Sequence, residues 1–571
     1  MARPRADRAR LLRLALAVAV LAAGGLALRG YVTDDTFIHL RYARNLVERG
    51  ELAFNPGETT YGCSSPLWVL GLALLMRLGA PALVAPWLLG ALSALLALLI
   101  LESLLHGLHL KPAWQAAVLL LAAADAWFLR WAWSGMETPL ATALPLLLLW
   151  PAGRGRTRPR VPPSLWIAWG AAAGLAGLTR PEFLLLGPLA LPWIAWRGER
   201  PLWRRTVLPS ALGAAVVLGP WLLYAWRTFG RLTPQTAAAK SYAATLSPSV
   251  IGGSLLRSAA QLGAVQGPLW VAFVVCAVLV VARSRARRGA GHGVPSTAAA
   301  PSSDEALGPP VWRERVPRER ACLLGIALTW TAVLCAGYAV KQVWVISRYL
   351  SPLAPALLLG LAAVADSLAG APALGAAVGA GEANAAAPGS SRGGVPGGGA
   401  AAGRPSRLYP RVAAGILLGG ALATFVVNVW LLTARVRPHA RELARGIREC
   451  LLPTGAWLRA NTPPGAVVAC IDVGALGWAS ERRIVDLAGL VSPELLAVGR
   501  REGFPAMVAS GAWLDVVRPD YLVDRTDGPP RWAGRSAHGI TFTLLRTCTI
   551  RGLGLSEPQP WTVALYRLTP Q

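Results

Sequence analysis

Charged residues are scarce in this sequence. Of its 571 residues, 15% are charged and 54% are hydrophobic. Long apolar segments can also be the buried helices of a large soluble protein, but such helices need charged faces between them, and this sequence has almost none. The composition therefore excludes a water-soluble enzyme and predicts a membrane protein.

Histidine and cysteine are few as well, with six and seven residues, and none of them has the spacing of a metal-binding motif. His39 is a candidate base or ligand. Since no second His or Cys lies at ligand spacing, we expect it to face along a helix of its loop instead. We predict no metal site and no cofactor, although assistance by a divalent ion stays open.

Acidic residues are outnumbered: 29 Asp and Glu stand against 56 Lys and Arg, for a net charge of +27. Nucleic-acid binding would require one basic face with interleaved aromatic residues on a soluble module. Instead, the arginines gather in short segments between apolar runs, at residues 3–10, 154–160, 197–205 and 283–288. Such segments stay on the cytoplasmic side of a membrane, so they predict which loops face the cytoplasm.

The apolar runs predict the membrane-spanning helices, because about 20 apolar residues cross the roughly 30 Å hydrocarbon layer. Eleven helices are expected, at residues 9–28, 83–105, 112–128, 137–150, 164–179, 181–196, 206–226, 267–282, 321–340, 349–367 and 410–432. The apolar stretch Pro66–Met76 is too short to span and predicts a re-entrant or interfacial helix. The first run is interpreted as an uncleaved helix, since no small-x-small cleavage site precedes Tyr31.

These helices make up a polytopic all-α membrane domain, residues 1–432, with a first outer loop at 30–66. With the N-terminus in the cytoplasm, eleven spans place the C-terminus outside, and the arginine distribution supports this count. Two cytoplasmic loops, 284–312 and 370–407, are rich in Ala, Gly, Pro and Ser and are predicted to be disordered.

Residues 433–571 have ordinary charge density and predict a small extracytoplasmic α/β domain. Strands are expected at 467–471, 483–485, 521–523, 541–545 and 562–568, and helices at 439–460 and 504–517. Cys450 and Cys548 lie near the two ends of this domain. A disulfide between them is one interpretation, and buried free thiols are the other, because sequence alone does not fix the pairing.

Asp34 and Asp35 follow the first predicted span by a few residues. Two adjacent carboxylates repel each other, and such a pair is suited to be a general base or an ion ligand. The alternative is capping: Thr33, Asp34 and Asp35 would stabilise the N-terminus of a helix over 36–48. The two roles are compatible, and the residues alone do not separate them.

The surroundings of this pair carry a resemblance. The first loop contains the strings Asp34-Asp35-Thr36-Phe37-Ile38, Arg41-Tyr42-Ala43-Arg44-Asn45-Leu46, Phe54-Asn55-Pro56-Gly57-Glu58, Tyr61-Gly62 and Ser65-Pro66-Leu67-Trp68. Later motifs are Gly135-Met136-Glu137, Arg348-Tyr349-Leu350-Ser351-Pro352 and the segment 457–465. Together these resemble GT-C glycosyltransferases, most of all the branch with the mycobacterial terminal arabinofuranosyltransferases. The Cys63-Ser64 pair departs from that pattern.

The resemblance implies transfer of a sugar from a polyprenyl-phosphate donor to a glycan or glycolipid acceptor, outside the inner (plasma) membrane and with inversion. It implies that an Asp of the first loop is the general base. We map this role onto Asp34 and Asp35 and favour Asp35.

A leaving phosphate needs nearby cations. Arg348 is the first candidate, and Lys341 and Arg180 are further ones, all at predicted outer helix ends. Interfacial snorkelling is the alternative for each. Glu137 and Glu182 are expected to orient the acceptor or to pair with an arginine. Tyr349, in the motif of Arg348, is predicted to contact the substrate.

Asp472 and Asp486 follow expected strands, where turn or capping roles are favoured over binding. Two further functions stay open: sugar transfer to lipid A or to a protein, and transport of a lipid-linked sugar. A transporter would be expected to have inverted repeats and charges at the bilayer midplane. This sequence has no visible repeat and its notable charges lie at helix ends, which favours an enzyme.

Overall fold

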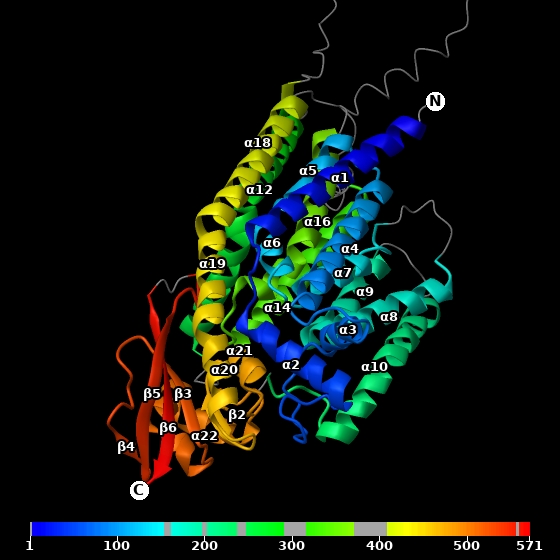
Figure 1. The fold of residues 1–571 in the computed structure, drawn as a ribbon. Helices are drawn as coiled ribbons and strands as arrows, with labels where there is room; N and C mark the ends of the chain where they lie inside the picture. The colour runs from blue at the N-terminus through cyan, green and yellow to red at the C-terminus, as the bar shows by residue number, and fades with distance from the viewer. Residues whose placement is uncertain are drawn as a thin grey trace, which may run out of the picture.

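The computed structural model describes residues 3–153, 161–196, 203–236, 247–290, 316–370, 408–555 and 559–571. Figure 1 shows a domain of long helices with a smaller sheet-containing domain, which includes the C-terminus, at one end. The N-terminus lies at the opposite end of the helical domain. A polytopic helical domain followed by a C-terminal α/β domain is therefore confirmed as the fold class.

Helices of the membrane domain account for most of the chain up to residue 431. They are α1 (Arg3–Ala27), α2 (Asp34–Arg49), α3 (Pro66–Arg77), α4 (Ala85–Gly107), α5 (Pro112–Ala124), α6 (Ala126–Ala132), α7 (Thr138–Leu148), α8 (Pro163–Thr179), η1 (Pro181–Leu185), α9 (Leu186–Trp196), η2 (Trp203–Val207), α10 (Leu208–Phe229), α12 (Pro248–Ala290), α14 (Arg318–Val340), α15 (Ser347–Leu350), η3 (Ser351–Leu353), α16 (Ala354–Gly370) and α18 (Leu408–Leu431). Proline occupies the first turn of α3, α5, α7 and α8, where its missing N–H leaves no hydrogen bond unmade.

All eleven predicted spans fall on helices, but the helices differ in length. Among the described residues, seven helices are long and apolar enough to cross a membrane, or eight if the bent pair α5 and α6 is one span. The apolar helices Thr138–Leu148 and Pro181–Trp196 are shorter, as is Pro66–Arg77, which the sequence already marked as too short. A polytopic membrane protein is thus confirmed, and the number eleven stays a prediction.

The span predicted at 112–128 is broken at Asp125, where α5 and α6 meet at 52°. The backbone of Asp125 is not helical, and its Oδ1 accepts hydrogen bonds from the backbone N–H groups of Trp127 and Phe128. The N–H of Ala126 donates to Oδ1 of Asn428 on α18. Side chains therefore satisfy three backbone donors that the break exposes within the bundle, as an apolar environment requires.

The helix α16 lies at the centre of the bundle, since the segment Ser347–Ser367, which runs from α15 through η3 into α16, contains an 18-residue stretch that is 94% buried. By contrast, α10 and α18 carry exposed apolar side chains such as Leu212, Val216, Leu418 and Leu422. An outward face of this kind is covered by lipid in a membrane. The bundle is thus organised around α16, with α10 and α18 at its periphery.

A single helical run from Leu408 to Asn461 leads from the membrane domain into the C-terminal domain. It consists of α18, η4 (Leu432–Val436), α19 (Arg437–Gly446), η5 (Ile447–Leu451) and α20 (Leu452–Asn461). The domain boundary predicted at 432 therefore falls inside continuous helix. Helix also extends into the segments predicted to be disordered, to Ala290 and to Gly370. The rest of those two segments lies outside the described residues.

The C-terminal domain contains one six-stranded sheet in the order β2-β1-β3-β6-β5-β4. Its elements are β1 (Val467–Cys470), α21 (Val473–Ser480), β2 (Arg483–Asp486), η6 (Pro493–Leu495), α22 (Leu496–Glu502), α23 (Phe504–Ser510), η7 (Ala512–Asp515), β3 (Tyr521–Thr526), β4 (Ser536–Ala537), β5 (Ile540–Ile550) and β6 (Trp561–Pro570). Strand β1 pairs in parallel with β2 and β3, and the remaining pairs are antiparallel. All five expected strands are present, and β4, with two residues, is too short to give a sequence signal.

Cys450 and Cys548 form a disulfide that joins η5 to β5. One of the two interpretations of these cysteines is therefore correct. Cys63 and Cys470 remain buried free thiols. The disulfide anchors strand β5 to the helical run that connects the two domains.

Replacing Cys548 by Ser is expected to lower the free energy of unfolding of the C-terminal domain. Its cross-link spans 98 residues, and closing a loop of that size in the unfolded chain is worth about 4.7 kcal/mol. Thermal unfolding of the full chain in detergent measures the loss. Reductant should destabilise the wild type by a similar amount and leave Cys548→Ser unchanged; an equal response of both proteins would contradict the prediction.

Candidate active site

A cavity of about 450 Å³ lies where the membrane domain meets the C-terminal domain. Segments distant in the sequence line it, among them α2, the turn before α7, the α8–η1 junction, the end of α14 and α15. Six of the seven residues predicted to react or bind are part of its wall: Asp35, Glu137, Arg180, Lys341, Arg348 and Tyr349. Asp34 is the seventh, and it is not among the lining residues.

The two adjacent aspartates have different partners. Asp34 accepts hydrogen bonds from the backbone N–H groups of Gly474 (2.9 Å) and Ala475 (2.8 Å), in the first turn of α21. Asp35 accepts one from Nη1 of Arg348 at 2.7 Å. Successive residues of a helix differ in direction by about 100°, so neighbouring side chains of α2 reach different parts of the molecule. Asp34 holds the C-terminal domain, and Asp35 belongs to the cavity.

Capping of the helix that begins here was the alternative role for Thr33, Asp34 and Asp35. That helix, α2, starts at Asp34 with Thr33 as its N-cap, and no side chain makes a cap hydrogen bond there. Asp34 caps α21 instead, 440 residues further along the chain. A Cβ atom on Gly474 would lie 2.0 Å from the carbonyl oxygen of Asp34, so glycine is required for this approach.

Burial raises the pKa of Asp34 to about 7, and the nearby charge of Asp472 acts in the same direction. The hydrogen bonds from Ala475 and Gly474 oppose this shift only in part. Between about pH 4 and pH 7 the folded protein therefore holds a proton that the unfolded chain has released. The free energy of unfolding must decrease as the pH rises through this window.

We expect Asp34→Asn to remove this part of the pH dependence, since the amide does not titrate and keeps one oxygen as an acceptor. The measurement is the unfolding temperature of both proteins between pH 5 and pH 8. The wild type should lose more stability than the variant as the pH rises. Parallel curves would show that Asp34 does not carry the effect.

Two buried arginines stand beside Asp35. Arg348 is 9% exposed in its side chain, whereas Asp35 is 47% exposed. Nη1 of Arg180 donates to the carbonyl oxygen of Arg348 at 2.9 Å, which ties the two residues together. Both guanidinium groups lie against the ring of Tyr349, with Cζ at 5.0 Å (Arg180) and 5.6 Å (Arg348) from its centroid. Tyr349 thus provides the surface against which both cations are placed.

Acidic side chains partly balance these cations. Nε of Arg180 lies 3.5 Å from Glu137 and 3.6 Å from Glu182. The hydroxyl of Tyr338 donates to Glu182 at 2.8 Å. Oε2 of Glu137 is buried and has no hydrogen-bond partner among the described residues. Of the two roles left open for Glu137 and Glu182, pairing with an arginine is present, and one buried carboxylate oxygen of Glu137 stays available.

Lys341 caps the C-terminus of α14 and is exposed at the cavity. His39 also lines the cavity, from the same face of α2 as Asp35, and is 6% exposed. Asp472 pairs with Arg525 at 2.6 Å in the C-terminal domain. Asp486 binds backbone N–H groups within a turn, in agreement with the turn role favoured for it.

The first-loop motifs contain a further set of residues whose role the sequence did not reveal. Arg41 is 2% exposed and donates to the carbonyl oxygens of Phe54, Gly477 and Arg482. Asn55 exchanges hydrogen bonds with the backbone of Ile484 in β2. These contacts join the loop to the C-terminal domain. Part of the string that carries the resemblance therefore serves docking, whereas Asp35, Ile38, Gly62 and Ser65 of the same strings line the cavity.

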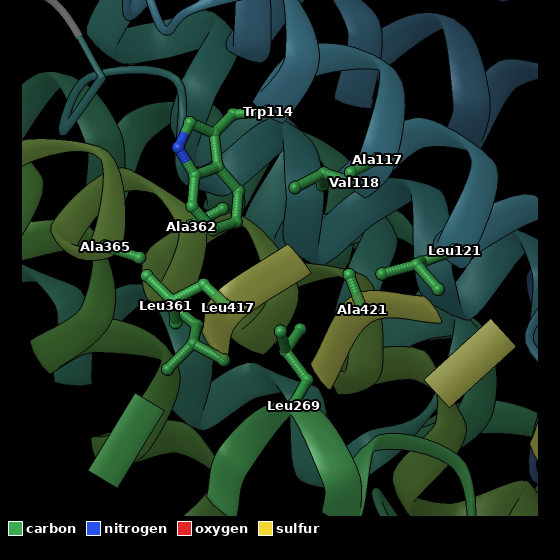
Figure 2. Close-up of a pocket in the computed structure, with 10 residues that line it drawn as sticks. All are labelled: Trp114, Ala117, Val118, Leu121, Leu269, Leu361, Ala362, Ala365, Leu417 and Ala421. Atoms are coloured by element: carbon green, nitrogen blue, oxygen red, sulfur yellow. The ribbon is translucent and has the colours of Figure 1, made fainter. Parts of the chain in front are cut away.

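A second cavity is too small for a substrate. It measures about 10 Å³, and its wall consists of apolar side chains from α5, α12, α16 and α18 (Figure 2). Among the described residues, no group of three or more His, Cys, Asp and Glu is placed to hold a metal ion. A third hollow, of about 570 Å³, is lined by Arg44, Arg448, Arg459 and Glu481 among others and contains none of the residues predicted to react or bind. The cavity around Asp35 combines substrate-sized space with six of those residues.

Comparisons with known proteins agree with this architecture. The crystal structure of ArnT from Cupriavidus metallidurans bound to undecaprenyl phosphate superposes with a TM-score of 0.54 at 16% identity, covering 97% of both chains. Its apo state gives 0.53 with the same identity and coverage. The chain has the GT-C fold. The likeness predicted from the first loop is confirmed at this level.

Sequence comparison provides a closer match over a shorter range. The terminal β-(1→2)-arabinofuranosyltransferase of Mycobacterium tuberculosis is 32% identical over 239 residues, which is 40% of this chain and 38% of that protein. A family model described as a domain of unknown function (DUF8728) matches residues 440–566. The chain thus aligns with less than half of its curated relative.

Proposed function

We propose that this protein is a membrane glycosyltransferase that moves a sugar from a polyprenyl-phosphate donor to a glycan or glycolipid acceptor, with Asp35 as the general base. The observation that carries the proposal is the contact between the Asp35 carboxylate and Arg348 in a cavity that also contains Arg180 and Lys341. A base for the acceptor and cations for the leaving phosphate are thereby in one place.

In the proposed reaction an acceptor hydroxyl oxygen attacks the anomeric carbon while the bond from that carbon to the phosphate oxygen breaks. The electron pair of that bond leaves with the polyprenyl phosphate, whose growing charge is stabilised by Arg348 and Lys341. Asp35 takes the hydroxyl proton. Because attack and departure occur on opposite sides of the carbon, the product has inverted configuration.

Each cation makes a different contribution. Nε of Arg348 is buried without a hydrogen-bond partner among the described residues, so this guanidinium has an N–H group to offer a phosphate oxygen. Arg180 fixes the backbone of Arg348, and the exposed ammonium of Lys341 lies at the cavity edge. We assign Arg348 to the phosphate, Arg180 to positioning, and Lys341 to the outer phosphate oxygens.

Two comparisons support the choice of substrates. ArnT, which shares the fold, was crystallised with undecaprenyl phosphate, which favours a polyprenyl-phosphate donor. The sequence relative is an arabinofuranosyltransferase, which favours a pentofuranosyl group as the transferred sugar. We place the protein in the inner membrane with a cytoplasmic N-terminus. The N-terminus and the C-terminal domain lie at opposite ends of the bundle (Figure 1), which supports placing the cavity on the extracytoplasmic side.

The direct test is a transfer assay with the full chain in lipid nanodiscs. Radiolabelled polyprenyl-phospho-arabinofuranose and a polyprenyl-phospho-hexose are supplied in parallel with an arabinan oligosaccharide or lipid A as acceptor. We expect acceptor-dependent transfer, with one polyprenyl phosphate released per sugar. Proteoliposomes that move the label across the bilayer without forming product would favour a transporter, and no transfer from any donor would refute the proposal.

A further inference from the structure

The C-terminal domain reaches the cavity through one short loop, residues 487–492, between β2 and η6. Leu490 in this loop lines the cavity together with residues of the membrane domain. Among the described residues that line the cavity, Leu490 is the one that belongs to the C-terminal domain. Its side chain is apolar and only partly buried. The part of the cavity wall that the C-terminal domain contributes is therefore uncharged.

The shape of this loop is set by a single carboxylate. Asp486 is fully buried, and its two oxygens accept hydrogen bonds from the backbone N–H groups of Ala488 (2.8 Å), Leu490 (2.6 Å) and Val491 (3.1 Å). Its own N–H donates to Oγ of Ser492 at 2.9 Å. The side chain of Asp486 thus holds the backbone at residues 488–491, and its N–H holds the end of the loop at Ser492.

The loop also fits closely against the first outer loop. A Cβ atom on Gly62 would lie 2.7 Å from Cγ1 of Val491 and 2.8 Å from the carbonyl oxygen of Leu490. Such distances leave no room for a side chain at position 62, which itself lines the cavity. Leu490 is therefore held in place by Asp486 on one side and by the backbone at Gly62 on the other.

We propose that the loop 487–492 is the acceptor wall of the cavity, in which Leu490 contacts an uncharged acceptor sugar and Asp486 is a positioning residue that holds Leu490 there. This inference rests on the proposed function. The cations that suit the donor phosphate come from helix ends of the membrane domain, on the bilayer side. Leu490 comes from the opposite side, that of the C-terminal domain, so the substrate that contacts it enters from water. An apolar side chain suits the apolar face of a neutral sugar.

The variants Leu490→Ala and Asp486→Asn test this division. Each is expected to raise the KM for the acceptor oligosaccharide about ten-fold, because each loses a contact worth more than 1 kcal/mol, while the KM for the polyprenyl-phospho-sugar stays unchanged. Leu490→Met, which conserves volume, should restore the acceptor KM. Matched controls are Leu544→Ala, on β5, and Asp520→Asn, whose carboxylate accepts the N–H of Val467. A parallel rise in donor KM, or no change in acceptor KM, would overturn the proposal.

Two readouts do not depend on catalysis. Hydrogen exchange at residues 488–491 should quicken in Asp486→Asn and not in Asp520→Asn, which separates a local change in the loop from misfolding. The acceptor oligosaccharide should protect Leu490→Cys from a maleimide. Absence of protection would refute the acceptor wall even if the wild type transfers sugar, whereas protection without any transfer would refute the proposed function alone.

Discussion

Asp35→Asn is expected to lower the kcat of sugar transfer by about 10²–10⁴-fold, the usual contribution of a general base. The amide has nearly the same shape as the carboxylate and can still accept a hydrogen bond from Arg348, so the substrates should bind as before. What it cannot do is accept the proton of the acceptor hydroxyl. The KM of the donor should therefore change little, and the measurement is single-turnover transfer at saturating donor and acceptor.

Asp34→Asn is the matched control, since it makes the same chemical change one residue away. Its side chain caps α21 and has no place in the cavity wall, so kcat should remain within about three-fold of the wild type. The opposite pattern, with transfer lost in Asp34→Asn and kept in Asp35→Asn, would exchange the two roles. Equal losses in both variants would point to a general effect of the interface between the domains.

The difference between these neighbours marks the limit of the sequence interpretation. Hydropathy located helices at all eleven predicted spans, and alternation located five strands, because burial against lipid or a core acts on each segment separately. The choice between Asp34 and Asp35 depends on α21 and α15, which lie hundreds of residues away. No pattern around residue 34 contains that information.

The motifs of the first loop had a similar limit. Arg41 and Asn55 lie in strings that resemble an active-site loop, yet both are buried against the C-terminal domain. Leu490, which lines the cavity, has no polar group and was not a candidate. An interpretation based on sequence favours charged residues near a reactive position. The three-dimensional contacts decide which of these residues hold a domain in place and which contact a substrate.

The break at Asp125 has a signal in the sequence. A carboxylate inside an apolar run is costly in a membrane unless it has a partner, and its presence at position 125 argued against one straight span over 112–128. The disulfide illustrates the opposite case. The two cysteines are 98 residues apart, and they pair because the fold places β5 beside η5, which the sequence does not show.

Arg348→Met is expected to have the second large effect, with kcat reduced by about 10²–10³-fold, as when one preorganised donor to a developing charge is removed. The variant keeps most of the side-chain volume but removes the partner of Asp35 and the N–H groups assigned to the phosphate. Arg348→Lys should recover only part of the rate. A planar guanidinium can donate one N–H group to the carboxylate and another to the phosphate, whereas an ammonium is a point charge and cannot make both contacts in this way. Inhibition by free polyprenyl phosphate should weaken in both variants.

Arg320→Met provides the control for this prediction. Arg320 pairs with Asp366 at 2.9 Å, and both side chains are largely buried, as is Arg348. This pair joins the beginning of α14 to the end of α16, next to the predicted cytoplasmic segments. Neither residue lines the cavity. Loss of the pair should lower stability and leave kcat and inhibition by polyprenyl phosphate unchanged. If Arg320→Met and Arg348→Met slowed transfer equally, the effect would belong to the loss of any buried ion pair. A selective loss in Arg348→Met would instead tie the rate to the cation beside Asp35, because the two variants differ in which end of the bundle loses its charge.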